Sequence, residues 1–356
     1  MRDDLLRERL AGYAAHGEEL ARPPEPAAIR RRARRHYGGR VLALVAVALL
    51  TFAGVQAVRT ALVGEVPPVR PAPTRSSFVA SDAEGRLVVV SADSGKLLRI
   101  LAPPPADYIL GTGPGYAPEV PGDRSAVYYA GACTGVRGAV WRQPLDGGRP
   151  TKVADGTGIS LTISEDGSTL AWVDQRCKGL HQERLTVRDL RRGTERHWPL
   201  ESGNESAYGL ALSPDGRRLA MMLSPPGQLE LRVLDTTGQG SLLDGRLLHV
   251  PDAGCQPEPP LAYRPGSGEL AVVEQCGPLN RSQLRLIYVD EASGVVRARP
   301  LVFPGSAAAT VVIGLDFDHS GTRLIYGLGR NQSWSTWEYR QGGSVKLGDG
   351  YAVPSW

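Results

Sequence analysis

The side chains best suited to covalent or metal chemistry are four cysteines, Cys133, Cys177, Cys255 and Cys276. The nearest two are 21 residues apart, whereas a structural zinc site normally draws on cysteines separated by only a few residues. The six histidines show no metal-site spacing, and His319 lies in a polar turn where we expect it to be solvated. We therefore predict no metal ion and no cofactor.

Motifs for nucleophilic or phosphate chemistry are equally scarce. No Gly-x-Ser-x-Gly nucleophile elbow occurs in the chain. The glycine-rich residues 111–115 open an expected strand rather than a helix, so they do not form a phosphate-binding loop. We predict no catalytic residue.

The charge distribution argues against a nucleic-acid partner. Residues 1–40 hold 10 basic and 6 acidic side chains, while the remainder holds 31 of each and is neutral. A nucleic-acid-binding domain needs a basic footprint on its folded surface. We therefore predict no nucleic-acid binding.

Residues 41–58 form an uncharged, mostly apolar run of 18 residues, long enough as a helix to span about 27 Å, close to the thickness of a bilayer core. Six arginines without an intervening acid lie between residues 30 and 40. The positive-inside rule then places the N-terminus in the cytoplasm and the rest of the chain outside. This predicts a single-pass protein of the cell membrane, anchored in lipid by residues 41–58.

Two alternatives to an uncleaved anchor remain open. Val55-Gln56-Ala57 could serve as a signal-peptide cleavage site, although the preceding 40 residues are too long for an ordinary signal peptide. The run could also be a buried helix. All four cysteines follow the run, which favours an oxidising compartment and two disulfides; four free buried thiols are the alternative.

Beyond a Pro-rich linker at residues 59–76, short β-like runs alternate with two recurring kinds of turn up to residue 356. The first kind feeds an apolar strand, and its glycines are Gly122, Gly167, Gly216, Gly268 and Gly321. The second follows an alternating strand, and its glycines are Gly95, Gly148, Gly193, Gly238, Gly294 and Gly343. Both series repeat about every 50 residues, the size of a four-stranded propeller blade.

The two series also predict how the ring closes. Six turns of the second kind but only five of the first indicate six blades, of which one is shared between the two ends of the repeat region. Residues 77–81 would supply the second strand of blade one and residues 351–356 its innermost strand, which removes an exposed sheet edge. We predict an all-β, six-bladed β-propeller, preceded by a short cytoplasmic helix and one transmembrane helix. A seventh, degenerate blade within residues 224–260 is the structural alternative.

The first turn series resembles a known repeat. Ser213-Pro214-Asp215-Gly216 followed by Arg-Arg-Leu-Ala, and Ser164-Glu165-Asp166-Gly167 followed by Ser-Thr-Leu-Ala, are similar to the S-P-D-G-x-x-L-A core of TolB-like, WD-type propeller repeats. The resemblance covers roughly residues 77–356. The resemblance implies a propeller that binds other proteins. It does not imply an enzymatic activity.

Placed on such blades, the cysteines lie on one face of the propeller. We expect Cys133–Cys177 to join blades two and three, and Cys255–Cys276 to staple a loop within blade five. The same face carries the longest loops, whose polar and aromatic side chains suit contact with a protein or a glycan. This candidate binding rim consists of Arg176, His181, Asn280, Arg281, Arg330, Asn331 and Trp334.

The first 40 residues contain a short amphipathic helix across residues 3–21. Its apolar face is expected to include Leu6, Leu10, Tyr13 and Leu20, which would need a partner to be buried. The arrangement of helix, arginine run, span and exported propeller resembles actinobacterial membrane anti-sigma factors and related sensors, although their zinc-binding H-x-x-x-C-x-x-C motif is absent.

Together these observations predict a membrane-anchored, extracytoplasmic propeller that is a non-catalytic binding or sensing module for a protein or glycan of unknown identity. One alternative is a regulator that sequesters a cytoplasmic partner through residues 3–21. The other is a propeller enzyme of the lactonase or cyclase type.

Overall fold

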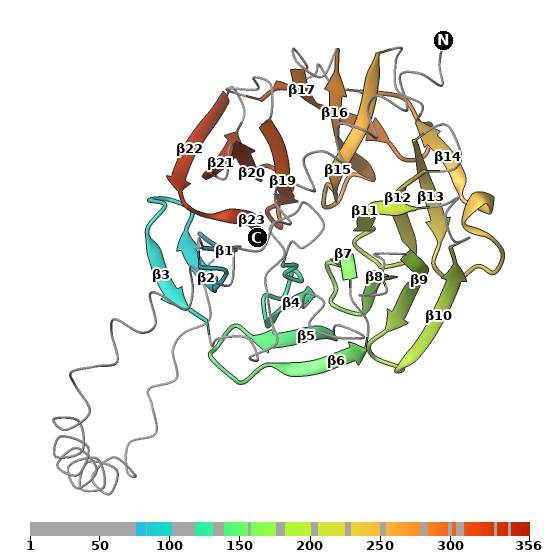
Figure 1. Ribbon diagram of the computed structural model, residues 1–356, viewed down its shortest axis with the longest axis horizontal. Helices are drawn as coiled ribbons and strands as arrows, with labels where there is room; N and C mark the ends of the chain where they lie inside the picture. The colour runs from blue at the N-terminus through green and yellow to red at the C-terminus, as the bar shows by residue number, and fades with distance from the viewer. Residues whose placement is uncertain are drawn as a thin grey trace, which may run out of the picture. The chain divides into compact units, whose positions relative to one another are not determined.

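The computed structural model describes residues 76–82, 84–101, 118–130, 139–155, 158–175, 182–200, 206–224, 229–249, 254–277, 283–297, 301–303, 310–330, 333–340 and 343–356. All belong to the second of two units into which the chain divides, Val69–Trp356. Within the described part, six antiparallel sheets are arranged around a central axis, as Figure 1 shows in a view along that axis. This is the predicted six-bladed propeller.

Blade one contains, from the axis outward, β23 (Ala352–Ser355), β1 (Ser77–Ser81), β2 (Leu87–Ser91) and β3 (Leu97–Ile100). Blade two contains β4 (Ala126–Ala130), β5 (Ala139–Pro144) and β6 (Thr151–Asp155), and blade three contains β7 (Gly158–Ile163), β8 (Thr169–Gln175), β9 (Gln182–Asp189) and β10 (Thr194–Pro199). Blade four contains β11 (Ala207–Leu212), β12 (Arg218–Leu223), β13 (Glu230–Asp235) and β14 (Arg246–His249). Blade five contains β15 (Cys255–Tyr263), β16 (Glu269–Cys276), β17 (Gln283–Asp290) and β18 (Leu301–Val302), and blade six contains β19 (Thr310–Phe317), β20 (Leu324–Arg330), β21 (Ser333–Arg340) and β22 (Gly343–Asp349).

Two places differ from a regular four-stranded repeat. In blade two the position of the innermost strand is taken by a single bridge, in which Glu119 pairs with Tyr128 of β4. Within residues 224–260 the described strands all belong to blades four and five, and the one other element there is a 3₁₀ turn, η1 (Leu242–Asp244), between β13 and β14. The alternative of a seventh blade is therefore wrong for the described part of the chain.

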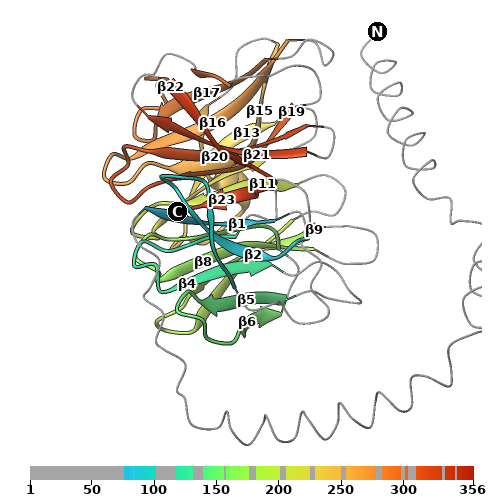
Figure 2. The same cartoon turned by 90° about the vertical axis from the view of Figure 1, so that its left-hand side faces the viewer.

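Turns of the first kind join the innermost strand of a blade to its second strand, and local hydrogen bonds explain their sequence. In blade four the Ser213 hydroxyl donates to Asp215 (2.6 Å) and accepts from the backbone N–H of Arg218 (3.0 Å). Gly216 follows with a φ of 69°, a conformation that favours glycine. Ser164, Asp166 and Thr169 make the same bonds in blade three. In Figure 2 these turns lie on the left side of the blades seen edge-on.

The ring closes as predicted, because β23 pairs with β1 through Val79 and Ser355 and through Ser81 and Ala352. Trp356 is only 5% exposed. Its ring meets Phe78 edge-on, with 6.3 Å between centroids, and the Arg323 guanidinium lies 4.7 Å from its centre. The chain's last strand is thus fastened inside its first blade.

Apolar residues fill the spaces between blades. On β12, Leu219 and Met221 pack with blade three, whereas Ala220 and Met222 pack with blade five. Because both faces of the second strand are buried, it forms a nearly continuous apolar run rather than an alternating one.

The predicted Cys255–Cys276 disulfide is present, with an S–S distance of 2.09 Å. It does not staple a loop as expected. The two cysteines lie directly opposite each other at the ends of β15 and β16, so the bond joins neighbouring strands. Cys133 and Cys177 lie outside the described residues, as do residues 1–75 with the expected span. None of the helices described here has the length and apolar character needed to cross a membrane.

Candidate functional site

A cavity of about 250 Å³ lies on the propeller axis, where the innermost strands run into their turns. Its wall is built from the last residues of β7, β11, β15 and β19, from the segment around Glu119, and from Trp356. Residues from every blade therefore converge on one small space. Such a position is a common place for a binding site in a ring-shaped fold.

Asp316 of β19 is an acidic group of this wall whose two carboxyl oxygens both accept hydrogen bonds. Its Oδ2 accepts hydrogen bonds from the Ser355 hydroxyl (3.0 Å) and the Trp356 N–H (2.8 Å), and its Oδ1 accepts from the N–H of Phe317 (2.8 Å). Burial raises the pKa of Asp316 to about 6, although these bonds and the charge of Arg124 oppose the shift. The carboxyl group thus ties blade six to the closing strand.

Glu119 provides a second carboxyl group from blade two. Burial and then the negative charge of Asp316 raise its pKa well above the usual range, while a hydrogen bond from the backbone of Ile163 partly offsets the shift. The neighbouring Val120 N–H donates to Ser355 (3.1 Å). Polar contacts near the axis thus link blades six, one, two and three.

Arg124 is the buried cation of the cavity. Its guanidinium Nη2 donates to the backbone carbonyl (2.6 Å) and the hydroxyl of Ser77 (3.3 Å). Burial lowers the pKa of Arg124, and the Asp316 carboxylate opposes this. Its backbone has a φ of 54°, which is strained for a residue with a side chain. The two bonds to Ser77 hold the end of the side chain in place.

His319 and Glu165 contact each other at the mouth of the cavity through Nδ1 and Oε1. His319 belongs to the turn of blade six and Glu165 to the turn of blade three. These blades are three places apart in a ring of six, so the contact crosses the axis. The side chain of His319 is 67% exposed, in keeping with the expected solvation, but it has a definite partner.

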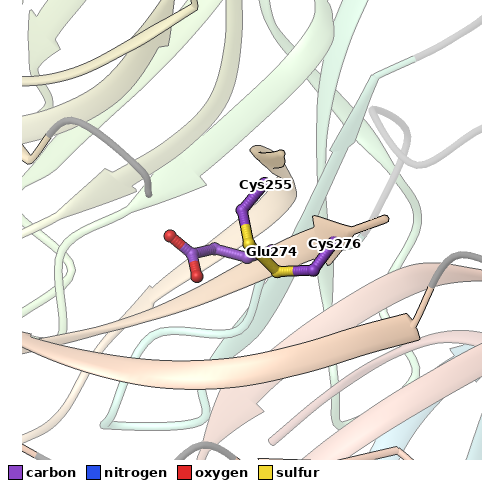
Figure 3. Close-up of side chains that lie close together, drawn as sticks. All are labelled: Cys255, Glu274 and Cys276. Atoms are coloured by element: carbon purple, nitrogen blue, oxygen red, sulfur yellow. A yellow bond between two sulfur atoms is a disulfide. The ribbon is translucent and has the colours of Figure 1, made fainter. Parts of the chain in front are cut away.

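Three side chains of the kinds that bind metal ions, Cys255, Glu274 and Cys276, lie close together in blade five (Figure 3). The two sulfurs are bonded to each other, so they cannot act as thiolate ligands. The Glu274 carboxylate accepts from Arg285 (2.6 Å) and meets His249 Nε2 at 2.9 Å. These residues therefore form a disulfide beside an ion-paired carboxylate.

Glu274 is fully buried and joins two blades, because His249 lies on β14 of blade four. Burial alone would raise its pKa, but the hydrogen bonds from His249 and Arg285 outweigh that effect and lower the pKa below the usual range. The carboxylate is thus ionised and committed to this boundary.

A larger hollow of about 1410 Å³ lies over the turns of blades three to five and contains many arginines. Several of them pair with acids of the same or neighbouring turns. Arg191 lies 3.3 Å from Asp166, Arg192 lies 3.1 Å from Asp189, and Arg218 lies 2.8 Å from Glu291. The charges are largely matched, which makes this hollow a weaker candidate than the axial cavity.

Two residues of the predicted binding rim are described. Arg330 is exposed at the end of β20, opposite the turn that leads into this strand, and thus lies away from the axial cavity. Trp334 is half-buried on β21, with ring atoms about 2.1 Å from where a Cβ on Gly329 would lie. The remaining rim residues are outside the described parts: Arg176, His181, Asn280, Arg281 and Asn331. So is the expected cytoplasmic face of Leu6, Leu10, Tyr13 and Leu20.

Sequence reasoning missed Glu119, Asp316, Arg124 and Glu165 as cavity residues. One signal was present, since Asp316 interrupts the otherwise apolar strand sequence TVVIGLDF. A charged residue within an innermost strand points to a specific structural or binding role. Glu119 and Glu165 carried no comparable signal in the sequence.

Comparison with known proteins supports the fold. No family profile matches the chain, and no curated protein matches it significantly in sequence. Among solved structures it is similar to TolB from Acinetobacter baumannii, with a TM-score of 0.57 and 16% identity over 84% of this chain and 70% of that one.

Two further structures resemble the propeller. A chain in a nidogen–laminin complex aligns with a TM-score of 0.54 and 14% identity, covering 78% of this chain and 97% of that chain. A putative TolB from Agrobacterium tumefaciens gives 0.51 and 15%, covering 78% and 90%. At these identities the likeness establishes the architecture, which is a TolB-like six-bladed propeller.

Proposed function

We propose that the chain is a single-pass membrane protein whose propeller lies outside the cytoplasm and is a non-catalytic binding module. The observation that carries the proposal is the axial cavity, to which residues of every blade contribute and whose mouth is open at the turns. A ligand bound there would lie against residues of all six blades, including Asp316, which binds Ser355 of the closing strand.

Three further features support this role. The disulfide between Cys255 and Cys276 suits an oxidising compartment. The apolar residues 41–58 suit a membrane anchor. Both oxygens of Asp316 accept hydrogen bonds from the fold, which leaves this carboxyl group occupied by a structural task rather than free for catalysis.

The test places a photoreactive benzoylphenylalanine at Ser320, an exposed residue at the mouth of the cavity, in the full-length chain in cells. The matched control places it at Val345, which is exposed on outer strand β22. We expect a discrete covalent adduct from position 320 and none of that size from position 345. No adduct at 320, or the same adduct at both positions, would contradict binding at the cavity.

The topology needs a separate measurement. A membrane-impermeant maleimide applied to intact cells should label cysteines of the full-length chain only after reduction. Labelling that requires lysis would place the propeller in the cytoplasm and remove the proposed localisation.

An enzyme is the second candidate function, because Glu119 is a carboxyl group of the cavity whose pKa burial raises well above the usual range. Such groups can serve as general acids. Metal analysis and a lactonase assay of the purified chain test this candidate; a stoichiometric metal ion, or turnover abolished by Glu119→Gln, would favour it.

A further inference from the structure

The contact between His319 and Glu165 spans the mouth of the axial cavity from two opposite blades. Glu165 is held in place by blade two, since the Gly122 N–H donates to its backbone carbonyl (2.7 Å). Its side chain also passes over Gly122, where a Cβ would come within 2.7 Å of Glu165 Cγ. The carboxylate is 24% exposed and therefore accessible from the mouth.

The turn that carries His319 is equally well defined. Asp318 Oδ1 accepts from the backbone N–H groups of Thr322 (3.0 Å) and Arg323 (3.1 Å). Arg264 Nε of blade five donates to the Gly321 carbonyl (2.8 Å). With both backbones fixed, the imidazole is the part of this contact that can move, because two thirds of it faces solvent.

The charged groups that line the cavity are unevenly balanced. The acidic side chains are Glu119, Glu165, Asp316 and Asp318, and the basic ones are Arg124 and His319. The raised pKa values of Glu119 and Asp316 mean that these two ionise less readily than ordinary carboxyl groups. The Arg124 guanidinium is already bonded to Ser77. The Glu165 carboxylate at the mouth therefore favours a cationic partner, and among the described residues His319 is the side chain that contacts it.

We propose that the axial cavity receives a lysine or arginine side chain of a polypeptide partner, and that this cationic group takes the place of His319 on Glu165. The inference rests on the proposed function, in which the cavity is the binding site. A volume of about 250 Å³ exceeds the roughly 150 Å³ of an engineered cavity that binds benzene, so one side-chain end group fits.

The experiment measures binding of two small probes to the full-length chain by the rise in unfolding temperature with probe concentration. Argininamide carries the guanidinium, and citrullinamide is its neutral counterpart of nearly the same shape. We expect argininamide to stabilise the chain and citrullinamide to have little effect.

Two substitutions of the same contact should act in opposite directions. His319→Ala removes the competing group, and argininamide should bind about tenfold more tightly. Glu165→Gln removes the charge that the probe needs, and binding should weaken about tenfold. The matched controls are His197→Ala and Glu195→Gln, which alter an exposed His–Glu contact on outer strand β10 and should leave binding unchanged.

A purely structural role for the contact would make both variants change in the same direction or leave probe binding unaltered, and that result would overturn the inference. Equal binding of argininamide and citrullinamide would overturn it as well. If photocrosslinking at Ser320 still succeeds in that case, the cavity remains a binding site and only the cationic ligand class is wrong.

Discussion

Asp316 and Glu274 are carboxyl groups at two boundaries of the ring, and each links its own blade to a neighbour. Asp316 joins blade six to the closing strand, and Glu274 joins blade five to blade four. Yet the pKa of Asp316 is raised to about 6, whereas that of Glu274 is lowered. Burial acts to raise the pKa of both groups, so burial alone does not explain the difference.

The difference lies in the hydrogen-bond donors. Glu274 is paired with the guanidinium of Arg285 and with His249, whereas Asp316 accepts from a hydroxyl and two backbone N–H groups and lies near the acidic Glu119. Charged donors stabilise the ionised form more than neutral ones do. A boundary can thus be held by a carboxyl group whose pKa is lowered or by one whose pKa is raised, and the two respond differently to pH.

The largest expected effect is that of Glu274→Ala, which leaves Arg285 and His249 without their shared partner. We expect a loss of about 4 kcal/mol in the free energy of unfolding, measured by urea titration. The control is Glu84→Ala, which removes an exposed acid paired with Arg86 and should cost at most about 1 kcal/mol. Equal losses for the two variants would show that burial of the pair does not matter.

Removing the nearby disulfide with Cys255→Ser and Cys276→Ser separates the covalent from the ionic contribution at the end of β16 (Figure 3). The bond spans 21 residues, for which loop closure predicts about 3 kcal/mol. Reductant should destabilise the parent chain. The double variant lacks the Cys255–Cys276 bond, so reductant should destabilise it less. An unchanged response to reductant would contradict this.

The pH dependence distinguishes the two carboxyl groups directly. For Asp316 the folded-state pKa is raised, so its contribution to stability is complete below the unfolded value and is lost as the pH rises through about 6. The penalty of Asp316→Ala should therefore shrink by roughly 2 kcal/mol between pH 4 and pH 7.

Glu274 should behave in the opposite way. Its pKa is lowered, so its contribution is present above the unfolded value and is lost as the pH falls through the folded one. Urea titrations of Asp316→Ala and Glu274→Ala from pH 7 to well below pH 4 provide the comparison. If the loss of stability in the two variants changed with pH in the same way, neutral and charged donors would have the same effect on the carboxyl groups, which would contradict this explanation.

The smallest expected effect belongs to Ser355→Ala, which removes the hydroxyl between Asp316 and the Val120 N–H. We expect a loss of about 1 kcal/mol, against no measurable loss for Ser94→Ala in an exposed turn. A double-mutant cycle with Asp316→Ala should show that the two losses are not additive. Additive losses would mean that the hydroxyl acts independently of Asp316.

The fold could be predicted from the sequence where the signal was local or repeated. Ser213 and Asp215 form a hydrogen bond within one turn, so the motif can be recognised from a few consecutive residues of the sequence. The closing strand was predictable because residues 351–356 match the innermost strands of other blades, and the count of turns left one such strand missing. The Cys255–Cys276 pair followed from its position in one blade.

The candidate site could not be predicted in the same way. Glu119 and Asp316 are about 200 residues apart, and Glu165 meets His319 only because blades three and six face each other. These contacts exist once the ring is closed, and no local pattern encodes them. The orientation of Trp334 over Gly329 likewise depends on strand pairing, with Trp334 directly opposite Gly329.

The fastening of β23 inside blade one has a consequence for how the chain folds. During synthesis β1 emerges early and must wait for β23 before its inner edge is covered, so this pairing has the longest sequence separation in the sheet. Contacts of this kind form slowly, and an uncovered strand edge invites pairing with another chain. Until β23 has been made, the inner edge of β1 in the incomplete first blade is therefore open to pairing with another chain.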